Sequence, residues 1–371
     1  MENTTVLYSK ADRGLTIALN QTIKEYFASI DKKQFADRPM VFKIVFGLGS
    51  WLGFYLLMIS GWFSGPLLCL MALLHGLTHL FIAFNISHDA NHGALSSSRK
   101  MNNLLSYSLD LIGVSSYLWK IAHNQEHHSF VNITPIDPSI QGYGILRFTP
   151  FEKLKRAFRF QHIYSIFFYG LSTFNYVTFK DLKLLIKSMR EGDKMPTKTL
   201  IITVLFKLFY YTYTIVLPIV LLDLSFGVVF LAFFILHFIN GQILTFVFQC
   251  GHLTEEAHYP EVEDGKVTDS WVVHIIKTTG DFAPKNKLLI WLVGGINLHV
   301  IHHLYPTICH IHYKGLTPHL KRTVAAHGLA YREIPTFTQA IGSHIALLKQ
   351  LGAENKEMAD GNYSKKSSLI F

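Results

Sequence analysis

Two long apolar blocks constrain what this chain can fold into more than any other feature of its sequence. Residues 41–86 contain one formal charge, Lys43, and residues 200–248 contain two, Lys207 and Asp223. A membrane-spanning helix needs about 20 apolar residues, so each block has room for two helices and a turn. The segments GWFSGP at 61–66 and LLDLSFG at 221–227 supply the turn residues. The sequence therefore predicts four transmembrane helices arranged as two hairpins.

The overall composition supports a membrane protein. Hydrophobic residues make up 50% of the 371 residues and charged residues 16%, whereas charged residues amount to about 25% of an ordinary soluble protein. The formal net charge is +9. In an apolar chain the usual cause of such an excess is the positive-inside bias of cytoplasmic segments. The sequence contains no basic module with interleaved aromatic residues, so we expect no nucleic-acid partner.

The distribution of Lys and Arg predicts the sidedness of the chain. Both outer turns lack them, whereas residues 1–40, residues 91–199 and the chain after residue 250 are rich in them. The positive-inside rule then places both termini and the central segment in the cytoplasm. We expect an all-α, multi-pass integral membrane protein. Residues 1–40 form an N-terminal cytoplasmic segment, residues 41–351 a membrane domain with a cytoplasmic helical cap, and residues 352–371 a disordered tail.

Three weaker apolar stretches, at residues 104–122, 163–179 and 288–300, are interrupted by polar residues or glycine. We expect them to form helices that lie in the membrane interface or pack over the bilayer face. Alternatively, one pair of them spans the membrane, which keeps the same sidedness. The N-terminus is polar, so we expect no cleavable signal peptide. Three widely spaced cysteines indicate neither a disulfide framework nor a thiolate metal site.

Histidine is the residue type that stands out in the composition, with 20 copies. Eight of them form three clusters beside the predicted spans, all on the predicted cytoplasmic side. Each cluster contains an i, i+4 pair, which on a helix brings two rings to one face, within reach of one metal ion. The clusters are NISHDANHGA with His88 and His92, AHNQEHHSF with His123, His127 and His128, and NLHVIHHLYP with His299, His302 and His303.

Three such clusters on one side of a membrane predict a metal centre. A single ion uses only some of eight imidazoles, so two ions are the natural count. Structural zinc sites are usually rich in thiolates, and a haem would need only one or two of these histidines. A carboxylate-bundle di-iron site would need two Glu-x-x-His motifs, and the chain has one, at Glu255 and His258. A pair of irons with imidazole ligands, or another redox metal, remains.

The order H-x-x-x-H, H-x-x-x-H-H, H-x-x-H-H with four spans resembles the integral-membrane fatty acid desaturases. The segments TTGDFAPKNKLLIWLVGG and GGINLHVIHHLYPTICHIHY resemble the surroundings of the third histidine box in front-end acyl-CoA and acyl-lipid desaturases. The resemblance covers about residues 40–350. Two departures exist. Front-end enzymes commonly carry Gln where this chain has His299, and many carry a fused cytochrome b5 domain marked by H-P-G-G, a motif that this sequence lacks.

The resemblance implies a function. It implies that two irons, reduced by an external donor of the ferredoxin or cytochrome b5 type, use O2 to introduce a cis double bond into a fatty acyl chain, carried as a CoA thioester or in a membrane lipid. It also implies a ninth metal ligand, for which His252 in FQCGHLTEEAH stands at the matching position. We expect His299 to be an iron ligand. The expected membrane is a bacterial inner membrane, with the endoplasmic reticulum as the alternative.

Polar residues within and near the boxes are candidates to orient the ligating rings. Asp89 and Glu126 could accept an N–H from a ligand ring, and Asn124 is a further candidate. Asp137 and Asp281 have either this role or that of loop residues. Among the remaining histidines, His75, His79 and His237 fall inside predicted spans, where we expect buried hydrogen-bonding roles. We expect surface or structural roles for His310, His312, His319, His327 and His344, and leave His258 and His274 unassigned.

Two other functions compete with acyl desaturation. A membrane hydroxylase or ketolase of the same superfamily differs only in the outcome after the first hydrogen abstraction, and the box spacing allows it. A histidine-rich metal transporter would place its ligands within the spans, along a pathway near the midplane. The predicted position of the clusters outside the spans argues against transport. The basic segment at 153–159 suits a donor protein, coenzyme A or anionic lipid, and positive-inside bias explains it equally well.

Overall fold

The computed structural model describes residues 6–191 and 195–353. Four helices in this part of the chain are long and apolar enough to cross a membrane, which confirms the predicted number. Helices α3, η1 and α4 are continuous and form the second span, and α9, η6 and α10 form the third. The spans are α2 (Arg38–Ile59), α3 (Gly65–Ile82) with η1 (Ala83–Ser87) and α4 (His88–His92), α9 (Thr197–Tyr211) with η6 (Thr212–Val216) and α10 (Leu217–Leu222), and α11 (Phe226–His252).

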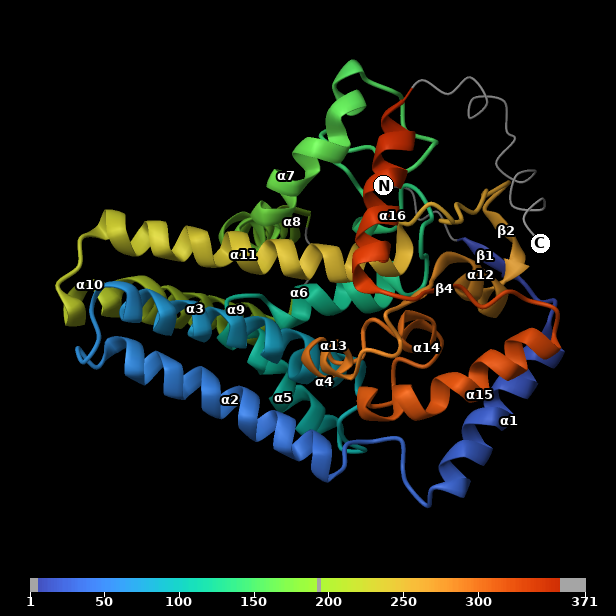
Figure 1. The fold of residues 1–371 in the computed structure, drawn as a ribbon, viewed down its shortest axis with the longest axis horizontal. Coiled ribbons are helices and arrows are strands. Elements are labelled where there is room, and N and C mark those ends of the chain that lie inside the picture. Colours follow the sequence, from blue (N-terminus) through green and yellow to red (C-terminus); the bar gives the residue numbers. More distant parts are fainter. Residues whose placement is uncertain (1–5, 192–194, 354–371) are drawn as a thin grey trace.

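The spans form two hairpins whose turns lie at the same end of the molecule, on the left in Figure 1. The first turn falls within the predicted GWFSGP segment, where Gly61 has a φ of 75° and Pro66 opens the next helix. The second lies within LLDLSFG, where the backbone of Asp223 is left-handed and the Ser225 hydroxyl accepts from the Val228 N–H. Both predicted turns are confirmed.

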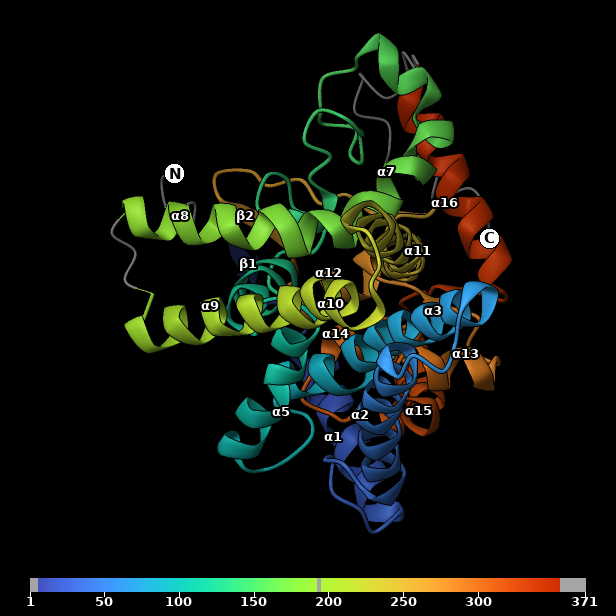
Figure 2. The same cartoon turned by 90° about the vertical axis from the view of Figure 1, so that its left-hand side faces the viewer.

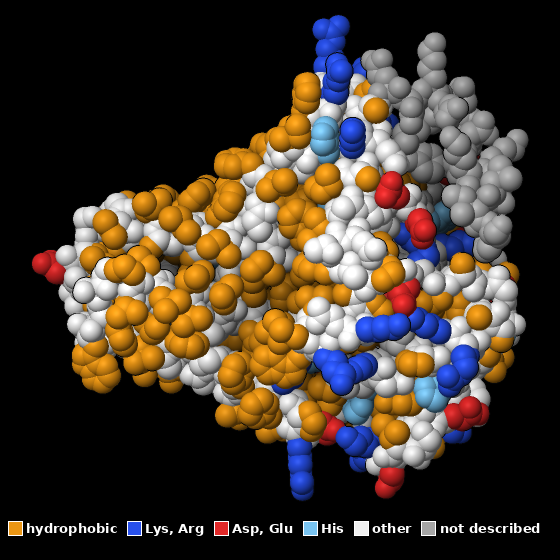
Figure 3. Space-filling view, in the orientation of Figure 1, with side chains coloured by type: hydrophobic (Ala, Val, Ile, Leu, Met, Phe, Trp, Pro, Cys, Tyr) orange, Lys and Arg blue, Asp and Glu red, His pale blue; other side chains and the backbone are white. Residues whose placement is uncertain are grey.

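The surface of the spans is apolar and exposed. Side chains such as Val45, Leu205 and Leu231 are more than half exposed. Figure 3 shows hydrophobic side chains covering the elongated half that contains the spans, while charged side chains gather on the opposite, broader half. An apolar surface of this extent is stable only against lipid, so the chain is a membrane protein.

The broader half is a helical cap into which the spans direct their other ends (Figure 1). The N-terminal helix α1 packs against α15, and α16 packs beside α7 along the end of α11 (Figure 2). Leu19, Val300 and Leu320 lie in one buried core that joins α1, α14 and α15. The cap helices outside the weaker apolar stretches are α1 (Arg13–Ser29), η2 (Ile121–His127), η3 (Pro138–Ile140), η4 (Arg156–Phe160), α8 (Asp181–Glu191), α12 (Trp271–Thr278), α14 (His299–Leu304), η7 (His310–His312), α15 (Tyr313–Ala326) and α16 (Phe337–Gly352).

The three weaker apolar stretches form helices, as predicted, and none of them is among the four candidate spans of the described residues. Helix α7 packs along α11 and presents Ile163 and Phe167 outward, more than half exposed. Leu104 and Leu288 are similarly exposed on α5 and α13. Such exposed apolar faces suit a helix at the membrane interface. The stretches correspond to α5 (Arg99–Leu111) with α6 (Ser116–Lys120), α7 (Gln161–Asn175) with η5 (Tyr176–Lys180), and α13 (Lys287–Leu292).

The described residues also contain two short pairs of parallel strands, which an all-α expectation omits. Strand β1 (Leu7–Ser9) pairs with β2 (Lys266–Ser270), and β3 (Asp281–Phe282) pairs with β4 (Glu333–Ile334). Both pairs lie in the cap and join segments that are distant in sequence. The fold remains essentially helical. The predicted boundary at residue 40 falls inside α2, which begins at Arg38, and residues 354–371 of the predicted tail lie outside the described residues.

Candidate metal centre

The first histidine cluster lies where the second span enters the cap. The helix hydrogen bonding widens to a π-helical segment in η1, which then leads directly into α4 with His88 and His92. Gly93 follows with a φ of 76° and ends the helix in the left-handed conformation that glycine adopts without strain. The two rings lie on one face, with centroids 4.7 Å apart, as their i, i+4 spacing predicts.

The second cluster occupies a π-helical turn, η2, which the sequence did not predict. The N–H of His128 donates to the carbonyl of His123, an i to i+5 bond of 2.9 Å. This wider turn brings the Nε2 atoms of His123 and His128 to 3.1 Å. His127, by contrast, points to a different group of rings. Its centroid lies 4.7 Å from that of His252.

The third cluster forms the short helix α14, whose start is held by a buried carboxylate. Asp281 Oδ1 accepts from the Val300 N–H at 3.0 Å, and Oδ2 accepts from the Tyr331 hydroxyl at 2.9 Å. Burial raises the pKa of Asp281 to about 6. His299, His302 and His303 are fully buried on this helix.

His252 ends α11, the fourth span, and its ring meets the third cluster. His252 Nε2 lies 2.7 Å from His299 Nε2. The preceding residue, Gly251, allows this approach. A Cβ at that position would lie 2.5 Å from the His299 ring. Gly251 is a site residue that the sequence analysis missed. The signal available was a glycine next to a candidate ligand inside a long apolar helix.

All nine predicted histidines converge into one buried cluster, in which two groups of four can each hold an ion. In each group one nitrogen per ring lies within 4.8 Å of the others. His128 lies between the groups, close to His302 of the first and His303 of the second. The first group is His88, His92, His123 and His302, and the second is His127, His252, His299 and His303.

This partition corrects the expectation from spacing alone. By the i, i+4 rule His123 and His127 share an ion, yet they fall in different groups. The reason is the π-helical turn, which rotates His127 away from the side that His123 faces. The adjacent residues His302 and His303 also separate, because neighbours on a helix point about 100° apart.

Hydrogen bonds fix the ring orientation in the second group. The Nδ1 atoms of His299 and His252 lie 2.8 Å from the Ile296 carbonyl and 3.3 Å from the Thr278 carbonyl, and His127 Nδ1 lies 3.0 Å from Asp137 Oδ1. A ring that donates from Nδ1 presents an unprotonated Nε2. Lone pairs on His252 Nε2 and His299 Nε2 then face each other, an arrangement that a shared cation stabilises.

The first group fits a metal for a different reason, which is the absence of protein partners. Among the residues that the structure describes, both ring nitrogens of His88 and of His302, and Nε2 of His92, are buried without a hydrogen-bond partner. Burial, reinforced by neighbouring imidazoles, lowers the pKa of His302 and His303 well below the usual range, and burial lowers that of His299 to about 3. His302 of the first group and His299 and His303 of the second are therefore neutral at physiological pH, which is the state that ligates metals.

A further group with metal-ligand spacing does not pass the same test. Asp89, Cys309 and His310 lie close together and buried. His310 Nδ1, however, lies 2.8 Å from Asp89 Oδ2, and its Nε2 lies 2.8 Å from the Lys43 ammonium. Both ring nitrogens are engaged and a cation is already present. This group is a buried polar network that supports α4.

Among the residues predicted to orient ligand rings, Asp137 hydrogen-bonds a ligand ring, whereas Asn124 bonds the backbone. Asp89 Oδ1 lies 3.7 Å from His88 Nδ1, while its other oxygen accepts from His310. Asn124 Nδ2 donates to the Asn91 carbonyl at 2.9 Å. Glu126 is half-buried on η2. Asp137 makes the hydrogen bond to His127 described above. Ser139, which the sequence analysis did not single out, has its hydroxyl 3.1 Å from the same His127 Nδ1.

The histidines inside the spans make the buried contacts expected of them, with one exception. His75 Nδ1 lies 3.0 Å from the Trp51 carbonyl, and His237 Nε2 lies 2.6 Å from the Tyr210 hydroxyl. His79 is buried, and its Nε2 has no hydrogen-bond partner within residues 6–191 and 195–353. In the cap, His344 is buried between Tyr169 and the Leu253 carbonyl, which agrees with a structural role.

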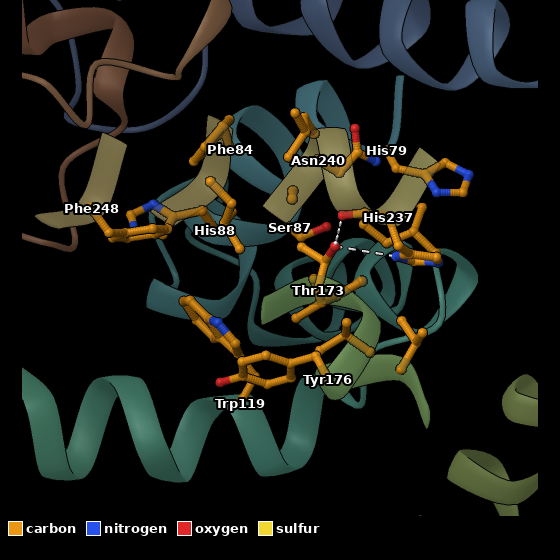
Figure 4. A pocket seen from close by; sticks show the side chains of 17 residues that line it. His79, Phe84, Ser87, His88, Trp119, Thr173, Tyr176, His237, Asn240 and Phe248 are labelled. Carbon is orange, nitrogen blue, oxygen red and sulfur yellow. Dashed lines mark hydrogen bonds between the residues drawn. The ribbon is translucent and has the colours of Figure 1, made fainter. Parts of the chain in front are cut away.

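An apolar cavity of about 90 Å³ leads from the metal centre into the spans. His88 lines it at one end together with Trp119 and Phe248, and His79 and His237 line it at the other (Figure 4). Leu, Ile, Val and Phe side chains form most of the wall between the two ends. The cavity suits a narrow apolar ligand that passes His88 of the first group.

Comparisons with known proteins identify the family to which the chain is similar. The family model described as fatty acid desaturase matches residues 60–335. The chain is similar to the sn-1 linoleoyl-lipid 6-desaturase of Synechocystis sp., with 32% identity over 92% of this chain and 96% of that protein. The protein of the same name from Arthrospira platensis is 32% identical over 91% of this chain and 92% of that protein. The acyl-lipid (8-3)-desaturase of Physcomitrium patens is 31% identical over 91% of this chain and 71% of that protein. The resemblance carried by the histidine clusters is confirmed.

Proposed function

The chain belongs to the fatty acid desaturase family and is an oxidoreductase, and from that premise we propose that it introduces a cis double bond into a fatty acyl chain with O2 at two irons. One observation carries the proposal: two groups of four buried imidazoles lie together, and His88 of the first group lines the end of an apolar cavity. Family membership sets the metal-transporter alternative aside.

The nine histidines would hold the two irons. His88, His92, His123 and His302 would bind one, His127, His252, His299 and His303 the other, and His128 lies within reach of both. The bound irons supply the oxidising power that removes hydrogen from an unactivated methylene, which no side chain can provide.

The chain's own residues orient the ligand rings, position the acyl chain and exclude water from it. Asp137 holds the proton of His127 at Nδ1, and the Ile296 carbonyl does the same for His299, so both rings keep one orientation. The cavity wall removes water from the acyl chain. Because His88 belongs both to the cavity and to the first group of ligands, a methylene that passes it is held beside the metal centre.

The substrate proposed is an acyl group esterified in a membrane lipid, since the relatives are named for lipid-linked acyl chains. An external donor of the ferredoxin or cytochrome b5 type supplies the electrons. We further propose that both termini and the cap are cytoplasmic, in a bacterial inner membrane or, alternatively, the endoplasmic reticulum. The excess of Lys and Arg away from the outer turns supports this sidedness.

Expression in a host with simple lipids tests the proposal, with the fatty acids profiled by mass spectrometry and the metals of the purified protein quantified. New cis double bonds in iron-loaded protein are the expected result. A hydroxylated product would favour the hydroxylase alternative. Zinc in place of iron after growth in iron-rich medium would overturn the di-iron assignment.

A pair of variants separates the metal centre from general folding. We expect His303→Ala and His127→Ala to abolish product while the protein still inserts into the membrane, because each removes a ligand that touches several others. The matched control is His327→Ala, at an exposed position. Full activity of His303→Ala would contradict the ligand assignment.

A further inference from the structure

A buried lysine links the first span to the metal centre, although α2 carries none of the nine predicted ligands. Lys43 is 4% exposed, and its Nζ lies 2.8 Å from His310 Nε2. The ring centroids of Phe81 and Trp291 lie 6.0 and 5.5 Å from the same ammonium. Among the described residues Lys43 forms no ion pair. Because a buried charge without a counter-ion costs free energy, the contacts with His310 and the two aromatic rings have to compensate for its burial.

The contact with Lys43 fixes the tautomer of His310. An ammonium has donors and no acceptor, so His310 Nε2 must accept and the ring proton must be on Nδ1. At the other edge of the ring, Nδ1 lies 2.8 Å from Asp89 Oδ2, which is an acceptor. Both contacts therefore require the same tautomer. Asp89 Oδ2 also accepts from the His310 backbone N–H at 3.0 Å, so two donors from η7 hold this carboxylate.

Asp89 lies in the last turn of the second span, between two candidate ligands of the first ion. Helix α4 has five residues and contains His88 and His92 of the first group. The bonds from His310 tie this turn to η7 in the cap. The other oxygen, Asp89 Oδ1, lies 3.7 Å from His88 Nδ1, which is longer than a hydrogen bond. His310 therefore acts on the ligands through the position of α4, and Lys43 acts through His310.

We propose that Lys43 is a positioning residue for the first metal ion, on which it acts by fixing the tautomer of His310. The inference rests on the proposed metal centre and connects to it a span that supplies no ligand. Without the ammonium the ring proton can move to Nε2, and Nδ1 then presents a lone pair to the carboxylate. Two acceptors that face each other repel, so Asp89 moves away and the turn that carries His88 and His92 loses its fixed position.

The test titrates metal-free protein in detergent with Co²⁺ in competition with a chelator, and records the visible absorption of the bound Co²⁺, which reports its coordination geometry. Lys43→Met removes the ammonium and keeps an apolar side chain of similar length. The matched control is Lys207→Met, which also removes an ammonium from a span. Lys207 pairs with Asp181 at 3.0 Å and donates to the carbonyls of Gly113 and Val177, and none of these partners is a candidate ligand.

We expect Lys43→Met to weaken the binding of one of the two ions about 10- to 100-fold and to change the absorption of that ion, while the other ion binds as in wild type. The weakened ion should be the one that His92→Ala weakens and not the one that His303→Ala weakens, because these variants each remove a ligand of one group. Lys207→Met should bind both ions as wild type does.

A second substitution separates the tautomer from a general loss of packing. An asparagine side chain has an N–H near the position of His310 Nδ1 and has no tautomers. The double variant Lys43→Met with His310→Asn should therefore recover most of the lost affinity. Unchanged affinity in Lys43→Met, an equal loss in Lys207→Met, or no recovery in the double variant would overturn the role of Lys43. If wild-type protein binds fewer than two Co²⁺ ions, the proposed two-metal centre itself fails.

Discussion

Gly251 marks the place where the fourth span and the third histidine cluster come closest. A Cβ there would lie 2.5 to 2.9 Å from atoms of the His299 ring, which is buried and cannot retreat without leaving its group. A single methyl group is therefore enough to disturb the second set of ligands. Glycine is required at this position because α11 and α14 approach each other closely there, and not because of helix propensity.

Gly251→Ala should accordingly lower the iron content of the purified protein by roughly half, because the ligands of one group are displaced while those of the other remain. Metal analysis and a thermal melt check this. Gly53→Ala is the matched control, since a Cβ at Gly53 meets nothing within 4 Å. Equal iron content in both variants would show that His299 is not a ligand.

Asp137 acts on the metal centre through His127. Its carboxylate accepts from the His127 ring and from the N–H groups of Asn132 and Ser139. Asp137→Asn keeps the shape but weakens the acceptor of the imidazole proton. We expect a roughly 10- to 100-fold loss of metal affinity, measured by competition with a chelator. Unaltered affinity would assign Asp137 to the loop alone.

At the scale of elements, π-helical turns determine which histidines share an ion. Segment η1 leads into α4, and η2 carries His123 and His127. Each π-helical turn contains more residues than an α-helical turn. Side chains four residues apart, which share one face of an α-helix, therefore point in different directions. Such turns occur often at functional sites. They arise where tertiary contacts offset the weaker local hydrogen bonding, which is why sequence periodicity does not indicate them.

The junction of α5 and α6 holds a buried carboxylate that makes stability depend on pH. Asp110 accepts from the Ser116 N–H at 3.2 Å, and burial raises its pKa to about 7. The folded-state pKa lies above that of an unfolded aspartate. Protonation therefore favours the folded state, and this stabilisation is present at acidic pH and is lost as the pH rises through about 7.

Asp110→Asn should then melt several degrees higher than wild type at about pH 8, with the difference shrinking towards about pH 5. The amide oxygen still accepts from Ser116, while the buried charge is gone. Thermal melts in detergent at both pH values measure the difference in melting temperature between the variant and the wild type. Asp264→Asn, at an exposed position, serves as control. A variant less stable than wild type at alkaline pH would contradict the assignment.

At the scale of the molecule, the metal centre joins four elements that are distant in sequence: α4, η2, the end of α11 and α14. Removal of metal should therefore lower the thermal stability of the whole cap. A ligand present at about 100 times its Kd stabilises a fold by about 2.7 kcal/mol. We expect a chelator to lower the melting temperature of the wild type, and to lower that of His303→Ala by less, because this variant lacks a ligand of the second group while the first group is intact. Equal shifts in both would indicate that the chelator acts elsewhere.

The sequence by itself determined the four spans, both turns, and which histidines form the clusters. These features are local, because span length follows from a run of apolar residues and each cluster lies within a few positions. The fold class and the family resemblance could be predicted for the same reason. The sequence leaves the roles of Asp137 and Asp281 open, since a loop carboxylate has no partner until the chain folds.

Only the tertiary structure decided how eight of the nine histidines divide into two groups of four, that Gly251 must be small, and that His79 Nε2 lacks a hydrogen-bond partner among the described residues. Each of these depends on distances between residues far apart in the chain, such as His88 and His302 or His252 and His299. Helical spacing fixes the relative direction of side chains on one element. It does not fix which element they meet, because that is set by the packing of the spans against the cap.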